Sequence, residues 1–200
     1  MIESHSDFEK PPANPLSLMK QWIDKAEKTN IIEPRSLVLS TIEASGLPSS
    51  RVVLMTCCND TGVIFGTSEQ SNKGKAIAAN PWVAGTLWWR ETLQQINFRG
   101  KTSKLSDRES NIMFQERPRA GQVVTILANQ SEPLMDENNL REKIVALTQS
   151  NEKLNRPDKW HGYRIAIEMI EFWQNDNDRL HKRLRYDLIQ NKWQYQILQP

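Results

Sequence analysis

Basic side chains recur at every second position near the C-terminus, in the stretch EFWQNDNDRLHKRLRYD that covers residues 171–187. Because alternate residues of a β-strand share one face, a strand here would place four of them on one side. Two arginines and a histidine on one face can bind a phosphate or a carboxylate. A solvated edge strand gives the same pattern, and the pattern alone favours that plainer interpretation. On an expected strand over 179–186, the four residues are Arg179, His181, Arg183 and Arg185.

A second group of hydrogen-bond donors lies in the first half of the chain. Arg51 opens an expected strand, and the sequence Ser71-Asn72-Lys73 opens an expected helix. A helix N-terminus offers free backbone N–H groups and the positive end of the helix dipole, to which serine and lysine side chains add further donors. This combination supports a phosphate site, although many helices that begin with serine bind nothing.

Other polar residues carry weaker signals. Arg117 and Arg119 flank Pro118 in an expected loop, where exposed arginines are common. The pairs Gln94–Gln95 and Gln130–Ser131 could bind the polar edge of a ring system. Taken singly, each of these groups is more typical of a structural role than of a binding site.

Several classes of site are absent from the sequence. It contains no P-loop, no glycine-rich dinucleotide fingerprint, no nucleophile elbow and no Cys/His cluster with zinc spacing. An enzyme with this sequence would therefore take its chemistry from an organic cofactor. The net charge of +2 argues against general nucleic-acid binding, which needs a broad basic surface.

Short runs of β-branched and aromatic residues, separated by turn signals such as Ser45–Gly46, dominate the first hundred residues. Such regular spacing predicts an α+β protein with a closed antiparallel sheet of about six to eight strands, a split barrel surrounded by helices. The expected strands cover residues 36–42, 51–56, 63–66, 83–89, 94–100 and 163–173, with a closing hairpin over 183–198.

Helices are expected at four places around this sheet. Residues 16–26 have helical spacing of apolar side chains, 71–80 begin with a capping Ser71, and 106–116 begin with a capping box formed by Ser106 and Glu109. A further helix is expected around residues 140–147. We interpret residues 1–14 as a flexible arm and residues 15–200 as one domain.

The chain has the composition of a cytoplasmic protein. No run approaches the roughly 18 apolar residues that a membrane span needs, and the N-terminus has no apolar signal core. The two cysteines, Cys57 and Cys58, are adjacent and cannot easily bridge each other within a strand, so we expect reduced thiols. The seven tryptophans fit either core packing or a flat surface for an aromatic ligand.

Five motifs occur in the order found in the FMN-dependent pyridoxamine 5′-phosphate oxidase family: SSRVVLM, GTSEQSNK, QQI, ANQSE and EFWQNDNDRLHKRLRYD. From about residue 15 to Pro200 the chain resembles this family. The resemblance implies a split β-barrel homodimer with FMN bound at the subunit interface. It implies phosphate binding by Arg51 and Lys73, with Thr67, Ser71 and Asn72 around them; backbone contacts to the flavin from Val52, Val53 and Gly66; further flavin contacts from Gln95, Gln130, Ser131, Trp173 and Arg183; and substrate contacts from Arg179 and His181.

One part of the family pattern is missing. In the vitamin B6 oxidases of the family, a Lys, a Tyr, an Arg and a Ser hold the substrate's phosphate. The matching positions here are Thr56, Met113, Arg117 and Gly121, so three of the four donors are absent. Each lost hydrogen bond to a charged group costs about 1.5–3 kcal/mol. The affinity for a phosphorylated substrate should therefore fall by roughly three orders of magnitude or more.

Two further stretches, EPRSLVLSTIEASGLPSSRVV and NPWVAGTLWWRETLQQI, resemble the phenazine-biosynthesis flavin oxidases within this family. This resemblance implies an FMN-dependent oxidase of a dihydro- or tetrahydrophenazine carboxylic acid, with O2 as acceptor and H2O2 as product. Met113 suits an apolar ring, and Arg117, Arg179 and His181 could hold a carboxylate. His181 could transfer a proton or could only bind. A vitamin B6 oxidase with a rearranged phosphate site and a flavin-binding protein without turnover stay open as alternatives.

Overall fold

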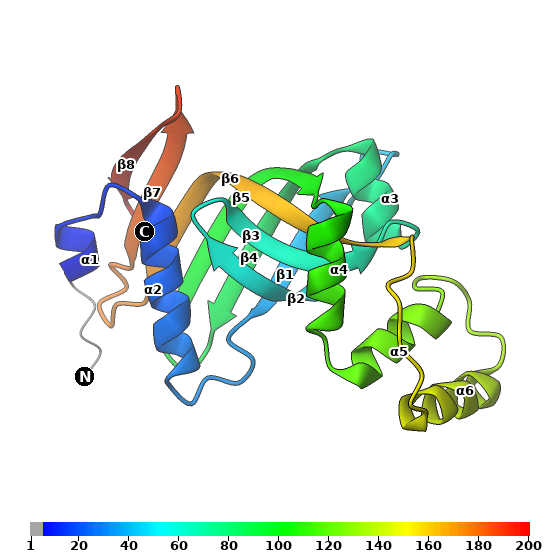
Figure 1. Ribbon diagram of the computed structural model, residues 1–200. Helices are drawn as coiled ribbons and strands as arrows, with labels where there is room; N and C mark the ends of the chain where they lie inside the picture. The colour runs from blue at the N-terminus through cyan, green and yellow to red at the C-terminus, as the bar shows by residue number, and fades with distance from the viewer. Residues whose placement is uncertain (1–5) are drawn as a thin grey trace.

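The computed structural model describes residues 6–200, in which eight antiparallel strands form one sheet in the order β3-β2-β1-β4-β5-β6-β7-β8. Because β3 also pairs with β6, the first six strands close into a barrel, and β7 and β8 extend from it (Figure 1). The predicted α+β fold with a closed sheet is thereby confirmed. The strands are β1 (Ser36–Ile42), β2 (Pro48–Asn59), β3 (Gly62–Ser68), β4 (Trp82–Trp89), β5 (Gln94–Lys104), β6 (Trp160–Gln174), β7 (Lys182–Ile189) and β8 (Lys192–Leu198).

Alternate residues of the barrel strands fill its interior. Leu37 and Leu39 of β1, Phe98 of β5 and Ile165 of β6 are all fully buried. Gly85 of β4 leaves room for one of these rings, because a Cβ atom there would come within 2.3 Å of Phe98. The barrel is therefore a packed scaffold rather than a channel, and ligands must bind on its outside.

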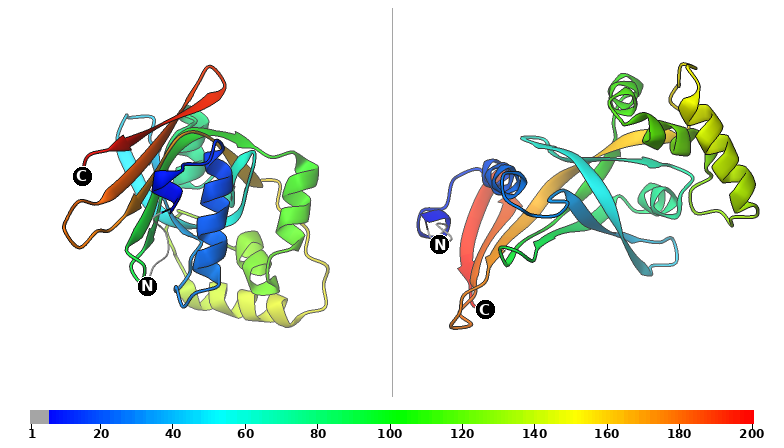
Figure 2. Two further views of the ribbon diagram at one scale, coloured as in Figure 1. Left: turned by 90° about the vertical axis from the view of Figure 1, so that its left-hand side faces the viewer. Right: turned by 90° about the horizontal axis from the view of Figure 1, so that it is seen from below.

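The helices lie at the two ends of the barrel. Figures 1 and 2 show α1 and α2 near β7 and β8, and α4, α5 and α6 at the opposite end. The expected caps are present: Ser71 caps α3, and Ser106 and Glu109 form a capping box at α4. The helices are α1 (Ser6–Glu9), α2 (Pro15–Glu27), α3 (Asn72–Ala79), α4 (Asp107–Gln115), α5 (Arg119–Leu127) and α6 (Glu137–Gln149). No helix within residues 6–200 is long and apolar enough to cross a membrane.

The predicted N-terminal arm is described only from Ser6 onward, and residues 1–5 lie outside the described residues. Asp7 accepts a hydrogen bond from the indole N–H of Trp22, and the carbonyl of Pro12 accepts one from the hydroxyl of Tyr186. These contacts join the later part of the arm to α2 and β7. The flexibility of the arm stays a prediction.

The sequence predicted that Arg119 lies in a loop. This prediction was wrong, because α5 begins at Arg119. Its guanidinium donates to the carbonyls of Leu147, Thr148 and Ser150 at 2.7–3.0 Å and to that of Glu152 at 3.1 Å. The last carbonyls of a helix lack partners within the helix, and a cation is favourable at that end. Arg119 therefore fastens the C-terminus of α6, a helix with no buried residue of its own, to the start of α5.

Replacing Arg119 with alanine should release α6. Hydrogen bonds from a charged donor contribute about 1.5–3 kcal/mol, and the remaining anchorage of α6 comes from partly buried side chains such as Ile144 and Leu147. We expect amide hydrogen exchange over residues 137–149 to become about 10- to 150-fold faster, with little change in the barrel strands. Arg141→Ala, on an exposed ion pair of the same helix, is the matched control and should change exchange little. Equal protection of α6 in both variants would contradict the role of Arg119.

Candidate functional site

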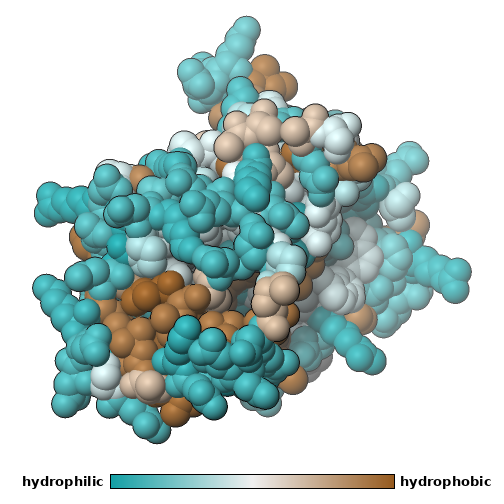
Figure 3. Space-filling model, turned by 90° about the vertical axis from the view of Figure 1, so that its right-hand side faces the viewer, coloured by the Kyte–Doolittle hydropathy of each residue, from teal (hydrophilic) through white to brown (hydrophobic). Residues whose placement is uncertain are grey.

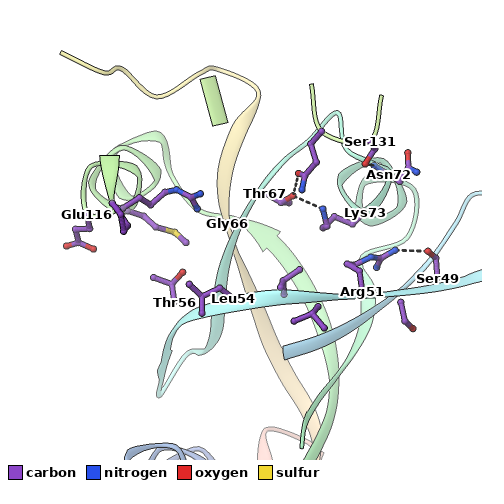
Figure 4. Close-up of a pocket in the computed structure, with 17 residues that line it drawn as sticks. Ser49, Arg51, Leu54, Thr56, Gly66, Thr67, Asn72, Lys73, Glu116 and Ser131 are labelled. Atoms are coloured by element: carbon purple, nitrogen blue, oxygen red, sulfur yellow. Dashed lines mark hydrogen bonds between the residues drawn. The ribbon is translucent and has the colours of Figure 1, made fainter. Parts of the chain in front are cut away.

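A cleft of about 790 Å³ lies between β2, the start of α3 and the junction of α4 with α5 (Figure 4). The elements that form it are distant in sequence, and the closed barrel fixes them relative to one another. Most of the predicted cofactor residues and two of the four predicted substrate residues meet here. Those that line the cleft are Arg51, Val52, Val53, Gly66, Thr67, Asn72, Lys73, Met113, Arg117, Gln130 and Ser131.

One end of the cleft carries two cations. The guanidinium of Arg51 donates to the carbonyl of Leu39, to Thr41 Oγ1 and to Ser49 Oγ, at 2.7–3.1 Å. The Lys73 ammonium is buried and donates to Thr67 Oγ1 at 3.3 Å. Among residues 6–200, neither cation forms a salt bridge with a carboxylate.

Burial lowers the pKa of Lys73 below its ordinary value, and the positive charge of Arg51 lowers it further. Burial also lowers the pKa of Arg51. Two partly desolvated cations without an acidic partner are costly for the folded protein. An anion between them would offset that cost, so this end of the cleft has the electrostatics of an anion site.

The N-terminus of α3 adds backbone donors to the same end. Ser71 is fully buried and caps the helix by accepting a hydrogen bond from the amide of Gly74. Its hydroxyl oxygen lies 3.3 Å from the hydroxyl oxygen of Thr67. Thr67 also donates to Gln130 Oε1, and the amide of Asn72 donates to Ser131 Oγ. The Gln130–Ser131 segment, 59 residues later than Asn72, is thus tied to the first turn of α3. This geometry fits an oxyanion such as a phosphate.

The middle of the cleft is an apolar wall formed by β2 and β3. Val52 is 62% exposed and Leu54 is 69% exposed, which is unusual for large apolar side chains on a barrel. Gly66 of β3 has no room for a side chain, because a Cβ atom would come 2.3 Å from the Trp160 ring. An apolar wall beside an anion site can hold a planar ring system that carries a phosphate.

At the opposite end of the cleft, Arg117 is a half-buried cation. Arg117 lies over the ring of Trp160, with its Cζ 5.3 Å from the ring centroid. Its Nη2 makes only long hydrogen bonds to the Gly121 carbonyl and Thr125 Oγ1, at 3.3 and 3.4 Å, and its buried Nε has no partner among the described residues. Burial lowers the pKa of this guanidinium too. Thr56 and Met113 are its neighbours in the cleft.

The remaining predicted residues do not line this cleft. Gln95 of β5 lies opposite Trp173 of β6, and the rings of Trp173 and His181 are 4.8 Å apart. Trp88 of β4 lies 6.1 Å from Trp173, and sequence reasoning did not single it out. This second cluster, which includes Arg179 and Arg183, lies where β7 leaves the barrel, at the end away from α4 (Figure 1).

The expected strand over 179–186 was wrong at its start. β7 begins at Lys182, and Arg179 has a φ of 64° in the preceding turn, so Arg179 and His181 do not share a strand face with the other two basic residues. Arg183 forms a two-point ion pair with Glu171, and Arg185 pairs with Asp187. The apparent basic face is thus partly neutralised by carboxylates of β6 and β7. Glu171 belongs to the quoted motif, but its ion pair with Arg183 runs diagonally between β6 and β7, because Glu171 lies opposite Arg185 in the strand register.

Large apolar side chains are also exposed away from the cleft. Trp82 of β4 and Ile42 of β1 line a second groove of about 700 Å³ that continues across to β7. Figure 3 shows hydrophobic residues gathered on one side of the molecule, the right-hand side of Figure 1. Leu134 and Met135, in the connection between α5 and α6, are also exposed. Exposed apolar surface of this extent marks interaction surfaces.

Comparison with known proteins places this architecture in a family. Residues 23–151 match the family model described as pyridoxamine 5′-phosphate oxidase, and residues 160–200 match the one described as the pyridoxine 5′-phosphate oxidase C-terminal dimerisation region. The chain is 38% identical to a dihydrophenazinedicarboxylate synthase of Pseudomonas chlororaphis, over 97% of this chain and 87% of the relative. It is 36% identical to a pyridoxine/pyridoxamine 5′-phosphate oxidase of Acaryochloris marina, over 94% of this chain and 87% of the relative.

A solved structure agrees with these relatives. The structure of PhzG from Burkholderia lata in complex with tetrahydrophenazine-1-carboxylic acid has a TM-score of 0.94 to this chain, with 36% sequence identity. The likeness covers 97% of this chain and 96% of the other. The barrel, the two extending strands and the helices are therefore those of a known fold.

Proposed function

Because the chain belongs to the pyridoxamine 5′-phosphate oxidase family, we propose that it is an FMN-dependent oxidase of a reduced phenazine carboxylic acid in phenazine biosynthesis. The observation that carries this choice of substrate is the far end of the cleft, where Arg117 is the cation and Thr56 and Met113 stand beside it. One guanidinium suits a carboxylate, while an apolar thioether suits a flat ring. The relatives named dihydrophenazinedicarboxylate synthase support the same choice.

The cleft residues fit an FMN molecule. Arg51, Lys73, Thr67 and the start of α3 would hold its phosphate, which would supply the missing anion between the two cations. The backbone of Val52, Val53 and Gly66 would lie along the ring system, with Gln130 and Ser131 at its polar edge. When bound, FMN supplies the redox chemistry: it takes two electrons from the substrate and passes them to O2, giving H2O2.

The second cluster would complete the site from the other subunit of a homodimer. The described residues place Gln95, Trp173 and Arg183 outside the cleft that holds Arg51 and Lys73. The match of residues 160–200 to a dimerisation region supports a homodimer, and the exposed apolar side chains of β1, β2 and β4 supply surface for it. In such a dimer FMN would lie at the subunit interface, with Arg179 and His181 of one chain over the flavin held by the other.

Mixing two impaired variants tests this shared site. Lys73→Met damages the cation cluster and His181→Leu damages the second cluster. If the clusters of different chains meet, a mixed dimer has one site with both defects and one intact site, so re-associated mixtures should recover about a quarter of the wild-type activity. Each variant re-associated alone is the control. A mixture no more active than its parents would contradict a site built from two chains.

A second candidate is a pyridoxine 5′-phosphate oxidase, which the Acaryochloris marina relative favours. It would use the same FMN site, and the phosphate of its substrate would lie at the end of the cleft that holds Arg117, without the donors missing at Thr56, Met113 and Gly121. Both enzymes would act in the cytoplasm, and the free thiols of Cys57 and Cys58 support that proposal. A flavin-binding protein without turnover would keep the cation cluster and show no reaction with either substrate.

A further inference from the structure

The turn between β6 and β7 is organised by one residue, Asp176. Its side-chain Oδ1 accepts from the amide of Asp178 at 3.1 Å, and its carbonyl accepts from the amide of Arg179 at 3.1 Å. An aspartate that bonds the backbone two residues ahead forms an Asx turn, which favours a left-handed residue nearby. Arg179 has this conformation, with a φ of 64°, although it carries a long side chain. Asp176 therefore fixes the backbone from which Arg179 projects.

The same residue also determines how His181 can act. The amide of Asp176 donates to Nδ1 of His181 at 3.3 Å. A backbone N–H can only donate, so Nδ1 must present its lone pair and the proton of the neutral imidazole must lie on Nε2. The only basic lone pair of the ring is then already engaged. The free nitrogen of the ring is a hydrogen-bond donor.

The position of the ring is fixed as well. Trp173 of β6 lies against His181, with ring centroids 4.8 Å apart, and Trp173 in turn lies 6.1 Å from Trp88. The Asn175 amide, next to Asp176, donates to the carbonyl of Leu93 and ties the turn to the β4–β5 connection. The imidazole is thus held by an aromatic face on one side and by a backbone donor on another. Such preorganisation suits a binding contact of defined direction.

We infer that Asp176 is a positioning residue which holds His181 as an Nε2–H donor, so that His181 binds the substrate's carboxylate and does not remove a proton from it. This inference rests on the proposed function, since it concerns the substrate of that site. Arg179, on the same turn, would join Arg117 of the other chain in supplying charge to that carboxylate. No side chain of this turn then acts as a base toward the substrate.

Substitutions at His181 separate a donor from a base. Glutamine can place an amide N–H near the position of Nε2 but has no basic nitrogen, whereas leucine has neither. For a donor, kcat/KM of His181→Gln with a reduced phenazine carboxylate should stay within about tenfold of wild type, and His181→Leu should lose about 10- to 150-fold. If His181 is a base, both variants should lose about 100- to 10,000-fold together, and that result would overturn the inference.

Substitutions at Asp176 test the turn itself. Asparagine keeps the Oδ1 acceptor, so Asp176→Asn should preserve KM, while Asp176→Ala should raise KM about 10-fold or more with a smaller change in kcat, because one turn fixes both Arg179 and His181. A merely structural role would lower the amount of folded protein without this split between KM and kcat. Equal KM values for the alanine variant and wild type would also contradict the inference.

Nitrogen NMR of the FMN-loaded protein gives a readout independent of turnover. With 15N-labelled histidine at about pH 8, above the ordinary histidine pKa, long-range proton–nitrogen correlations identify the protonated nitrogen. The His181 signal is the one missing from His181→Gln. An Nε2–H signal is expected, and an Nδ1–H signal would overturn the inference. If instead wild-type flavin is not reduced by any reduced phenazine carboxylate, the proposed function fails, while the NMR result still decides the state of His181.

Discussion

Replacing Lys73 with methionine is expected to weaken FMN binding by about 10- to 150-fold, because a charge-assisted hydrogen bond to a phosphate contributes about 1.5–3 kcal/mol. Lys73 is buried beside Arg51 without an acidic partner, so the phosphate is the natural counterion. Fluorescence titration of the apoprotein with FMN measures the effect. Lys75→Met is the matched control, since Lys75 is exposed on the same helix and should leave the affinity unchanged.

Although Lys73→Met should weaken FMN binding, it should stabilise the protein without FMN. We expect the free energy of unfolding of the apoprotein at neutral pH to be higher with methionine at this position. Burial lowers the pKa of Lys73 in the folded state, while in the unfolded chain it returns to about 10.5. Between these two pKa values the unfolded state binds more protons, so the free energy of unfolding of the wild-type apoprotein should rise with pH in that window. Lys73→Met should lack this rise. A variant that loses FMN affinity and is also less stable without FMN would contradict the idea of an unpaired cation.

Restoring the three missing phosphate donors should convert the substrate preference. In the triple variant Thr56→Lys, Met113→Tyr, Gly121→Ser, we expect kcat/KM for pyridoxine 5′-phosphate to rise on the order of 1,000-fold, since each recovered bond contributes about 1.5–3 kcal/mol. The site has room at position 121, because a Cβ atom there would lie 3.4 Å from Arg117 Nη2, an ordinary contact. Steady-state oxidation of pyridoxine 5′-phosphate, followed by H2O2 release, measures the change.

Met113 needs a separate control because it is 7% exposed and packs in a buried cluster with Leu105 and Trp160. A tyrosine there could overpack the cluster and cost about 1–3 kcal/mol of stability. The double variant Thr56→Lys, Gly121→Ser leaves that cluster intact and should still gain about 100-fold. A well-folded double or triple variant with unchanged kcat/KM for pyridoxine 5′-phosphate would contradict the assignment of this end of the cleft to the substrate.

Local signals in the sequence were sufficient for much of the fold. Capping residues such as Ser71 and Ser106 act on the next turn of the chain, so they could be recognised without tertiary information. The alternation of apolar residues likewise located the strands. The start of β7 could not be found in this way, because the Asx turn at Asp176 removes Arg179 and His181 from a strand that their alternation favours. The clamp from Arg119 to α6 also joins residues about 30 positions apart, and no local pattern marks it.

Some features of the candidate site were likewise predictable from the sequence, and others were not. The cation cluster of Arg51 and Lys73 was predicted, and the cleft brings both residues together with Gln130 and Ser131. The lack of a partner for the buried Nε of Arg117 could not be predicted, since it depends on the position of this side chain over Trp160. Trp173 and His181 lie outside the cleft within one chain, and their assignment to the same site depends on a second chain. The order of motifs along the sequence predicts which residues belong to a site, but not whether one chain or two chains bring them together.

Anaerobic mixing with the two candidate substrates tests most directly which of them the protein oxidises. The FMN-loaded protein is mixed without oxygen with a reduced phenazine carboxylic acid and, separately, with pyridoxine 5′-phosphate, while the flavin absorbance is followed. We expect the flavin to bleach rapidly with the reduced phenazine and to stay oxidised with pyridoxine 5′-phosphate. Rapid bleaching by pyridoxine 5′-phosphate, with no reaction of the reduced phenazine, would contradict the proposed function.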